Sequence, residues 1–394
     1  MKYAVWFVRL VFAAWMIPAG LNHFIPLFPQ PMGTQPLSQE LIRALLDSHL
    51  FDLVKAVELV AGVGVLIGWY TPLMLLICLP VSFNVFYWDA PLEGWGSRAA
   101  LFGYATFLCN ALLCLAWFRS YRDMFALRAT AARPSQVLVA RVVFGAWMVL
   151  HAANILFLSL WAAPAGHGAL ATQLMTALVN SGLLDVAMTL QLLLGALILA
   201  GVAVPAALCL LMPITTCALF WALFLDQQAL TALLTLLAFA LNGLLMLAYL
   251  PYYRGVLERS PPAAGETADG RSHFDALFVA ASGRSSRAEY VPALVTVVAA
   301  LAFFHYEVTG RTATFCMLML VYPSAVLLAR RLRDLGQPLG LLALPLLLTL
   351  AGFGVELGYL SLGSGVDGVM TWLALGVAGL FLLWGGVRET ARLG

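Results

Sequence analysis

The stretch RLVFAAWMIPAGLN, residues 9–22, decides the fold because it returns as RVVFGAWMVLHAAN at residues 141–154. Arg9 aligns with Arg141, and nearly the same offset in numbering relates later residues of different chemical types. Chance similarity between apolar segments would not preserve a constant offset through so many residue types, so the sequence predicts a duplicated unit. The later pairs are Asp52 and Asp185, Pro80 and Pro213, Trp88 and Trp221, Asn110 and Asn242, and Tyr121 and Tyr253.

The composition of the chain is that of a membrane protein. Of its 394 residues, 62% are hydrophobic and 10% are charged, and the mean hydropathy is +0.93. Soluble domains carry about 25% charged residues, so an ordinary soluble protein is excluded. We expect an all-α polytopic membrane protein with about twelve transmembrane helices in three four-helix units. The expected segments are 3–25, 51–69, 71–89, 98–118, 137–159, 183–202, 204–225, 229–250, 290–307, 312–330, 339–356 and 368–387.

The spacing of these segments predicts the domain boundaries. The first unit is expected over residues 1–125 and the second over 134–256. Four crossings return a chain to its starting side, so the two units should be parallel repeats related by an axis along the membrane normal. Residues 257–289 are polar and rich in Pro, Gly and Ser, which predicts a cytoplasmic linker. A last four-helix membrane domain is expected over 274–390.

The first unit resembles the DoxX family of bacterial four-helix membrane proteins. The resemblance covers residues 5–120 and rests on GLNHF (20–24), KAVELVAG (55–62) and the region of Asn84. It implies a compact four-helix bundle and a link to membrane oxidoreductase complexes, including a quinone-reducing thiosulfate oxidoreductase. Some relatives look more like assembly or partner-binding subunits. His23 stands where the family usually has Lys, and the second unit matches the layout more than the motifs.

The last domain is similar to the domain-of-unknown-function family 805, a bacterial inner-membrane domain. The residues that carry this resemblance are GRSSRAEY (283–290) and RRLRDLGQ (330–337). Arg333 stands where that family usually has His. The resemblance implies fold and location and no particular chemistry.

The placement of arginines predicts the orientation of the chain. Arginines follow the fourth, eighth, tenth and last expected spans, all on one side of the membrane. The positive-inside rule makes that side cytoplasmic. We therefore expect a multi-pass protein of the bacterial inner membrane with both termini in the cytoplasm.

Charged residues inside the second segment mark a candidate site. Asp52, Lys55 and Glu58 are spaced by three, so they lie on one face of a helix. A lone charge deep in lipid costs at least about 2.5–3.5 kcal/mol, and an ion pair between Lys55 and Glu58 would lower that cost. The second unit has Met188 and Gln191 at these two positions, which favours a function in the first unit. The same groups could instead only hold helices together.

Other polar residues of the first unit are expected to complete an outer-leaflet pocket for a ligand. A quinone or a lipid is the candidate, with His23 donating a hydrogen bond to a quinone oxygen and Lys55 and Glu58 tuning polarity or relaying a proton. No cofactor is certain from the sequence, and the spacing of His and Cys indicates no metal site. The pocket residues expected are Asn22, His23, Asp52, Lys55, Glu58, Asn84 and Asn110.

The last domain carries a second polar cluster. We expect this cluster either to form ion pairs between two helices or to bind anionic lipid headgroups. Its residues are Arg284, Arg287, Glu289, Arg330, Arg331 and Asp334.

The function that these patterns favour is that of an accessory membrane subunit. It would bind a lipophilic molecule or a protein partner at the outer-leaflet pocket. The expected partners are membrane lipids and a membrane or periplasmic redox protein, and the chain has no nucleic-acid motif. Two alternatives stay open, a quinone-linked oxidoreductase subunit and a small-molecule transporter.

Overall fold

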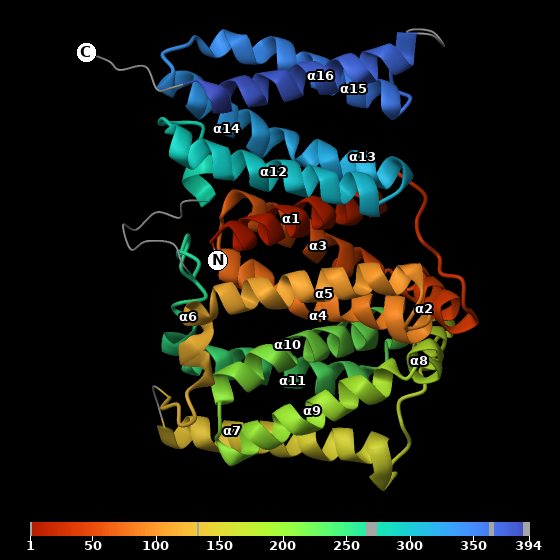
Figure 1. Ribbon diagram of the computed structural model, residues 1–394. Coiled ribbons are helices and arrows are strands. Elements are labelled where there is room, and N and C mark those ends of the chain that lie inside the picture. The colour runs from red at the N-terminus through yellow and green to blue at the C-terminus, as the bar shows by residue number, and fades with distance from the viewer. Residues whose placement is uncertain (1, 132–133, 265–273, 362–365, 389–394) are drawn as a thin grey trace.

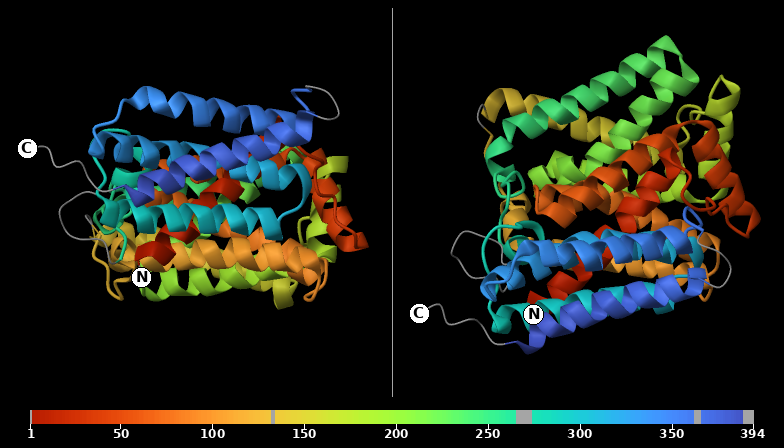
Figure 2. Two further views of the ribbon diagram at one scale, coloured as in Figure 1. Left: turned by 45° about the horizontal axis from the view of Figure 1, so that its top comes forward. Right: turned by 90° about the horizontal axis from the view of Figure 1, so that it is seen from above.

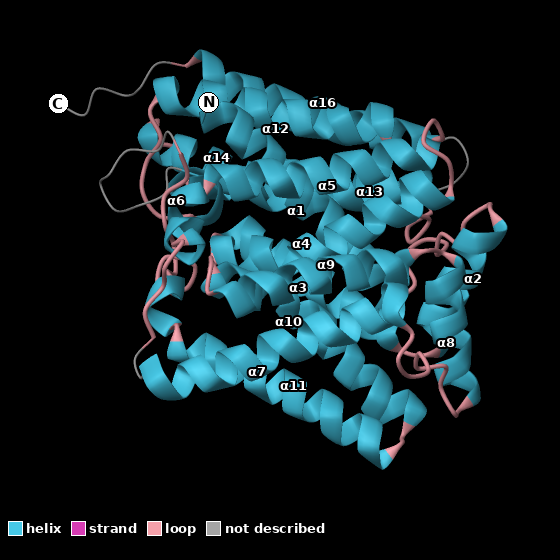
Figure 3. Ribbon diagram, turned by 90° about the horizontal axis from the view of Figure 1, so that it is seen from below, coloured by secondary structure: helices cyan, strands magenta, loops and turns pink. Residues whose placement is uncertain are grey.

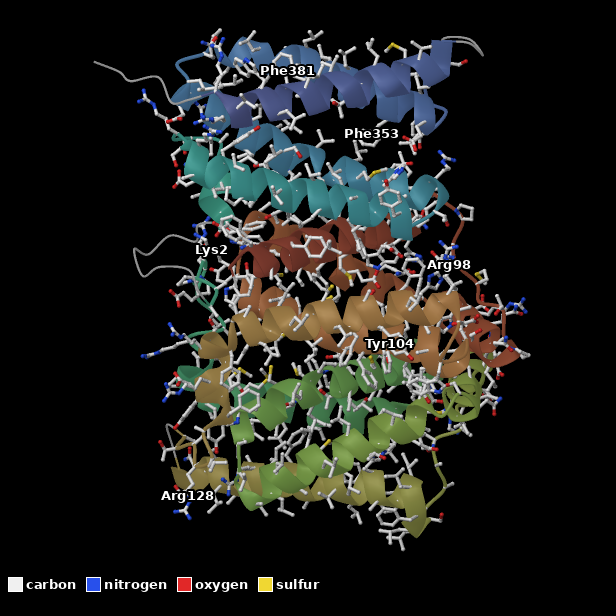
Figure 4. The ribbon with its side chains drawn as sticks, viewed as in Figure 1. Lys2, Arg98, Tyr104, Arg128, Phe353 and Phe381 are labelled. Carbon is white, nitrogen blue, oxygen red and sulfur yellow. The ribbon has the colours of Figure 1, made fainter. Side chains whose placement is uncertain are left out.

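The fold is all-α in every part of the chain that the structure describes. The structure is a computed structural model that describes residues 2–131, 134–264, 274–361 and 366–388, so residues 265–273 of the expected linker lie outside it. Ten helices in these ranges are long and apolar enough to cross a membrane. This confirms the predicted polytopic all-α membrane protein. Figure 4 shows Lys2 and Arg128 at one end of the helices and Arg98 at the other.

The first unit is a bundle of four long helices with a short helix between the first two. Gly68 ends α3 with a φ of 74°, a left-handed conformation that glycine adopts without strain, and Pro72 lies in the first turn of α4. Helix α1 packs along α3, and α4 along α5. The elements are α1 (Lys2–Phe24), α2 (Pro36–Asp47), α3 (Leu50–Ile67), α4 (Thr71–Tyr87), the π-helix η1 (Trp88–Leu92), α5 (Arg98–Ala116), α6 (Phe118–Tyr121) and the 3-10 turn η2 (Arg122–Phe125).

The second unit repeats this order of helices. Helix α7 packs along α9 and α10 along α11, the same pairing as in the first unit. The elements are α7 (Pro134–Ala153), η3 (Asn154–Leu158), α8 (Ala169–Asn180), α9 (Leu183–Ala200), α10 (Val204–Phe220), η4 (Trp221–Asp226), α11 (Ala229–Ala248) and η5 (Leu250–Tyr253).

Hydrogen bonds between helices recur in the two units at equivalent positions. Each bond joins the same kinds of groups at positions that the repeat aligns, so the tertiary contacts are repeated as well as the sequence. The bonds are Tyr121 Oη to Pro72 O and Tyr253 Oη to Pro205 O (both 2.8 Å), Trp88 Nε1 to Ser38 O (2.9 Å) and Trp221 Nε1 to Ala171 O (3.2 Å), and Asn110 Nδ2 to Ser82 Oγ (2.9 Å) and Asn242 Nδ2 to Thr215 Oγ1 (3.3 Å).

The third group of helices follows a short π-turn. Helices α13 and α14 together form one candidate span, Gly310–Asp334. Helix α12 begins with a capping box, in which Ser286 and Glu289 each satisfy the backbone of the other. The elements are η6 (Asp275–Val279), α12 (Arg287–Glu307), α13 (Gly310–Met319), α14 (Val321–Asp334), η7 (Leu339–Leu342), α15 (Ala343–Glu356) and α16 (Val366–Val387).

The first unit lies between the other two groups of helices (Figure 1). Helix α1 contacts α12 and α13, and α2 packs against α8 of the second unit. Figure 2 shows the N-terminus and the last described residues on the same side of the helices. We call this side the terminal end; α2 and α8 lie together at the opposite end (Figure 3).

Two helices besides the ten lie alongside them. Helix α3 has the length of a span but carries three charged residues, and α16 extends over 22 residues. Ten of the twelve expected transmembrane helices therefore have the length and composition of a membrane span, and α3 and α16 fall outside these ten.

Candidate functional site

The predicted ion pair between Lys55 and Glu58 is present on α3. Lys55 Nζ lies 2.7 Å from Glu58 Oε2. The Glu58 side chain is 2% exposed and that of Lys55 11%. Lys55 Nζ also lies 4.8 Å from the centre of the Phe51 ring, a cation–π contact. Two charges are therefore held together in an apolar surrounding, each lowering the cost of burying the other.

Two glycines fix the position of this pair by letting α1 approach α3 closely. A Cβ added at Gly20 would lie 2.8 Å from Lys55 O, and one added at Gly62 would lie 2.9 Å from Met16 Cβ. Small residues at such contacts allow two membrane helices to pack backbone against backbone. The charged face of α3 is thereby held rigidly beside α1.

A cavity of about 1900 Å³ lies between the first and second units, and the ion pair is in its wall. Most of its lining is apolar, with few charged groups. Its volume exceeds the roughly 300–1,000 Å³ of pockets for drug-sized ligands, so a long molecule fits it. The polar lining of the first unit includes Lys55, Glu58, Asn84, Asp89, Glu93 and Arg98, and that of the second includes His151, Asp185, Thr189 and Gln191.

His23 and Asp52 form a separate cluster that does not line this cavity. His23 Nε2 lies 2.7 Å from Asp52 Oδ1, and His49 Nδ1 lies 3.1 Å from Asp52 Oδ2. The Asp52 side chain is 44% exposed. The structure therefore divides the expected pocket, because His23 and Asp52 lie outside the cavity while Lys55 and Glu58 line it.

The three asparagines of the expected pocket also differ in position. Asn22 lines part of the cavity, but its Oδ1 accepts hydrogen bonds from the backbone N–H groups of Leu27 and Phe28, both at 2.8 Å. Asn110 is fully buried and donates to Ser82. Asn84 is in the cavity wall. Asn22 and Asn110 thus have structural partners, whereas Asn84 is placed to meet a ligand.

Glu93 is a buried acidic residue that is not among the pocket residues expected from the sequence. It accepts hydrogen bonds from Thr34 N (2.8 Å) and from the hydroxyl group of Ser38. Burial raises the pKa of Glu93, but the hydrogen bonds from Ser38 and Thr34 outweigh burial and hold the pKa below its ordinary value. The sequence repeat indicates a shared role for this position, because it aligns Glu93 with another acidic residue, Asp226. Asp226 also accepts a hydrogen bond from a loop backbone, that of His167 N at 2.8 Å.

The second unit has Met188 and Gln191, two uncharged residues, where the first has Lys55 and Glu58. Gln191 Nε2 lies 3.1 Å from both Met148 O and His151 Nδ1. The sequence gives no signal for the contact with His151, because the two residues are 40 positions apart. The two walls of the cavity are therefore chemically different.

The polar cluster of the third group holds backbone segments together. Arg331 is fully buried, donates from Nε to Gly385 O at 2.8 Å, and forms an ion pair with Asp334. Arg330 donates to Arg284 O at 2.9 Å. Glu289 caps α12, and the Arg284 and Arg287 side chains are exposed. The cluster makes one ion pair within α14 and otherwise binds mainly backbone carbonyls.

The arrangement offers polar groups to an organic ligand. Within the described residues, no three His, Cys, Asp or Glu side chains are grouped so that they could hold a metal.

Comparison of the chain with protein-family models, with curated proteins and with solved structures gives no match. The resemblance to the DoxX family and to family 805 therefore stays a prediction.

Proposed function

We propose that the chain is an accessory membrane protein that holds a lipophilic molecule with a polar head group in the cavity between its first two units. The observation that carries the proposal is the position of the Lys55–Glu58 pair in the wall of a large apolar cavity. Ionisable groups inside a membrane protein are costly and mark functional sites by default.

The chemistry of the pair favours an oxygen-bearing head group. An ammonium group has three N–H donors, and Glu58 accepts from one of those of Lys55. The remaining donors suit a quinone carbonyl or a lipid oxygen. The apolar walls suit a hydrocarbon tail, since burying apolar area contributes about 25 cal/mol per Å².

A matched set of variants tests this proposal. Lys55→Met combined with Glu58→Gln gives the first unit the residues of the second, and no charge is left unpaired. The molecule retained after mild purification, identified by mass spectrometry of lipids and quinones, should fall at least about tenfold, because a hydrogen bond to a charged group contributes roughly 1.5–3 kcal/mol. Asp52→Asn, on the same helix but outside the cavity, should keep it. A folded double variant that binds as much as the wild type would refute the proposal.

The position of the cavity favours transport as a second candidate. Transporters built from repeats place their substrate sites where the repeats meet. Uptake of the retained molecule into proteoliposomes, absent with the double variant, would favour transport. A redox protein that co-purifies with a bound quinone would favour an oxidoreductase subunit instead.

We place the chain in a bacterial inner membrane with the terminal end in the cytoplasm, from the arginine distribution and the positive-inside rule. This orientation would put α2 and α8 outside. In a background without native cysteines, a membrane-impermeant maleimide should then label Gln35→Cys in intact cells and leave Arg128→Cys unlabelled.

A further inference from the structure

Arg9 and Arg141 occupy equivalent positions in the two repeats but have different surroundings. The Arg9 side chain is 1% exposed, and its Nη2 lies 2.7 Å from Asp275 Oδ1 in η6. Its Nε donates to Val65 O at 2.8 Å, near the end of α3. The guanidinium carbon lies 3.8 Å from the centre of the Phe274 ring. In the first unit the chain thus supplies its own carboxylate to this arginine.

The carboxylate of Asp275 sits where only glycine leaves room. A Cβ added at Gly68, the residue that ends α3, would lie 2.2 Å from Asp275 Oδ1. Arg9, the glycine end of α3 and the aromatic ring of Phe274 therefore form a built site for an acidic group. The two charged residues are 266 positions apart in sequence.

The second unit keeps the arginine and the glycine, but no described carboxylate pairs with this arginine. Gly201 ends α9 at the position that the repeat aligns with Gly68. A Cβ added at Gly201 would lie 2.8 Å from Arg141 Nη1, so the guanidinium group lies against this end of the helix. Within the described ranges, Arg141 Nε is buried without a hydrogen-bond partner, and Arg141 forms no ion pair.

We propose that Arg141, at the Gly201 end of α9, binds the phosphate group of an anionic phospholipid. The planar guanidinium fork matches phosphate oxygens in geometry and charge. Arg141 is seven residues into α7, about 10 Å from the start of the helix, a depth that an arginine reaches from the headgroup region. The phosphate pairs with Arg141 as the Asp275 carboxylate pairs with Arg9 in the first unit.

The position of α7 at the edge of the molecule explains why the ligand is a lipid. Helix α1 is covered by α12 and α13, whereas α7 lies at the edge opposite the third group of helices (Figure 1). Val139, Val142 and Val143 beside Arg141 are exposed apolar side chains. The hydrocarbon tails of a lipid can pack on these valines while its phosphate binds Arg141. A soluble anion has no apolar part to contact the valines.

The test compares lipid binding by the full-length protein and its variants. Phosphatidylglycerol, added to the detergent-purified protein and followed by native mass spectrometry, should bind at least about tenfold more weakly to Arg141→Gln than to the wild type. Arg141→Lys keeps the charge without the fork and should bind with intermediate strength. Arg128→Gln, an exposed arginine at the terminal end, is the matched control and should bind as the wild type does.

Two further binding measurements distinguish an anionic lipid from a soluble anion or a neutral lipid as the ligand of Arg141. Inorganic phosphate at the same concentration should not displace phosphatidylglycerol, and phosphatidylcholine should not replace it. Equal binding by Arg141→Gln and the wild type would overturn the proposal, as would equal losses in Arg141→Gln and Arg128→Gln. Displacement by inorganic phosphate would show a soluble-anion site and overturn the lipid assignment. An Arg141-dependent dimer or protein complex that persists in lipid-free detergent would also overturn it.

Discussion

The first unit places an ammonium and a carboxylate 2.7 Å apart in the cavity wall, whereas the second places Met188 and Gln191 at the same two positions. At other positions the units share hydrogen bonds, such as those of Tyr121 and Tyr253 to equivalent proline carbonyls. The repeat therefore separates two kinds of polar residue. Those that make the same hydrogen bond in both copies hold helices together, and those that differ in residue or in surroundings between the copies are free to serve a function.

The largest expected effect comes from breaking the charged pair on one side only. Lys55→Met leaves Glu58 buried without its partner, and we expect a loss of about 3–5 kcal/mol in the free energy of unfolding. Adding Glu58→Gln should recover most of that loss, because no orphan charge is left. Denaturation in detergent of the single and double variants measures both effects. If the single variant were as stable as the double, the pair would not be buried as described.

A smaller effect, equal in the two units, is expected at the helix contacts that both copies keep. A Cβ at Gly62 would lie 2.9 Å from Met16 Cβ, and one at Gly195 would lie 2.9 Å from Met148 Cβ. Gly62→Ala and Gly195→Ala should each cost about 1–3 kcal/mol in stability, since added methyl groups overpack close helix contacts. Thermal unfolding of the two variants in detergent measures the losses.

The control for these glycines is Gly243→Ala on α11, where an added Cβ meets nothing within 4 Å. This change should be neutral or should stabilise the protein by up to about 1 kcal/mol, as alanine is the better helix former. Unequal losses at Gly62 and Gly195 would show that the two scaffolds are not equivalent.

The smallest effect is the acid sensitivity conferred by Glu93. The pKa of Glu93 is lower in the folded protein than its ordinary value of 4.5 because the hydrogen bonds from Ser38 and Thr34 outweigh burial, which acts in the opposite direction. Its stabilising contribution, about 1 kcal/mol, is therefore present above pH 4.5 and lost as the pH falls through the folded pKa. Glu93→Gln should flatten the fall in melting temperature on acidification, whereas Glu258→Gln at the surface should not. Identical acid profiles for the wild type and Glu93→Gln would contradict this role.

Part of the candidate site could be predicted because it depends on local spacing. Lys55 and Glu58 are three residues apart on one helix, so their contact follows from helical geometry alone. The partners of His23 and Asn110 are 29 and 28 residues away, and no periodicity identifies them. The expected pocket therefore contained this ion pair, which the structure shows, together with residues such as His23 and Asn110 that have partners elsewhere.

The sequence by itself determined the class of the protein, its repeat, its apolar spans and the charged face of α3. These features follow from composition and from the 3.6-residue period, which act within one segment of chain. Only the tertiary structure decided that a cavity lies between the two repeats, that Arg9 forms an ion pair with Asp275 and that Arg141 has no such partner among the described residues. Those outcomes depend on which helix faces pack together across large sequence separations, and packing depends on the shapes of whole surfaces that no local pattern encodes.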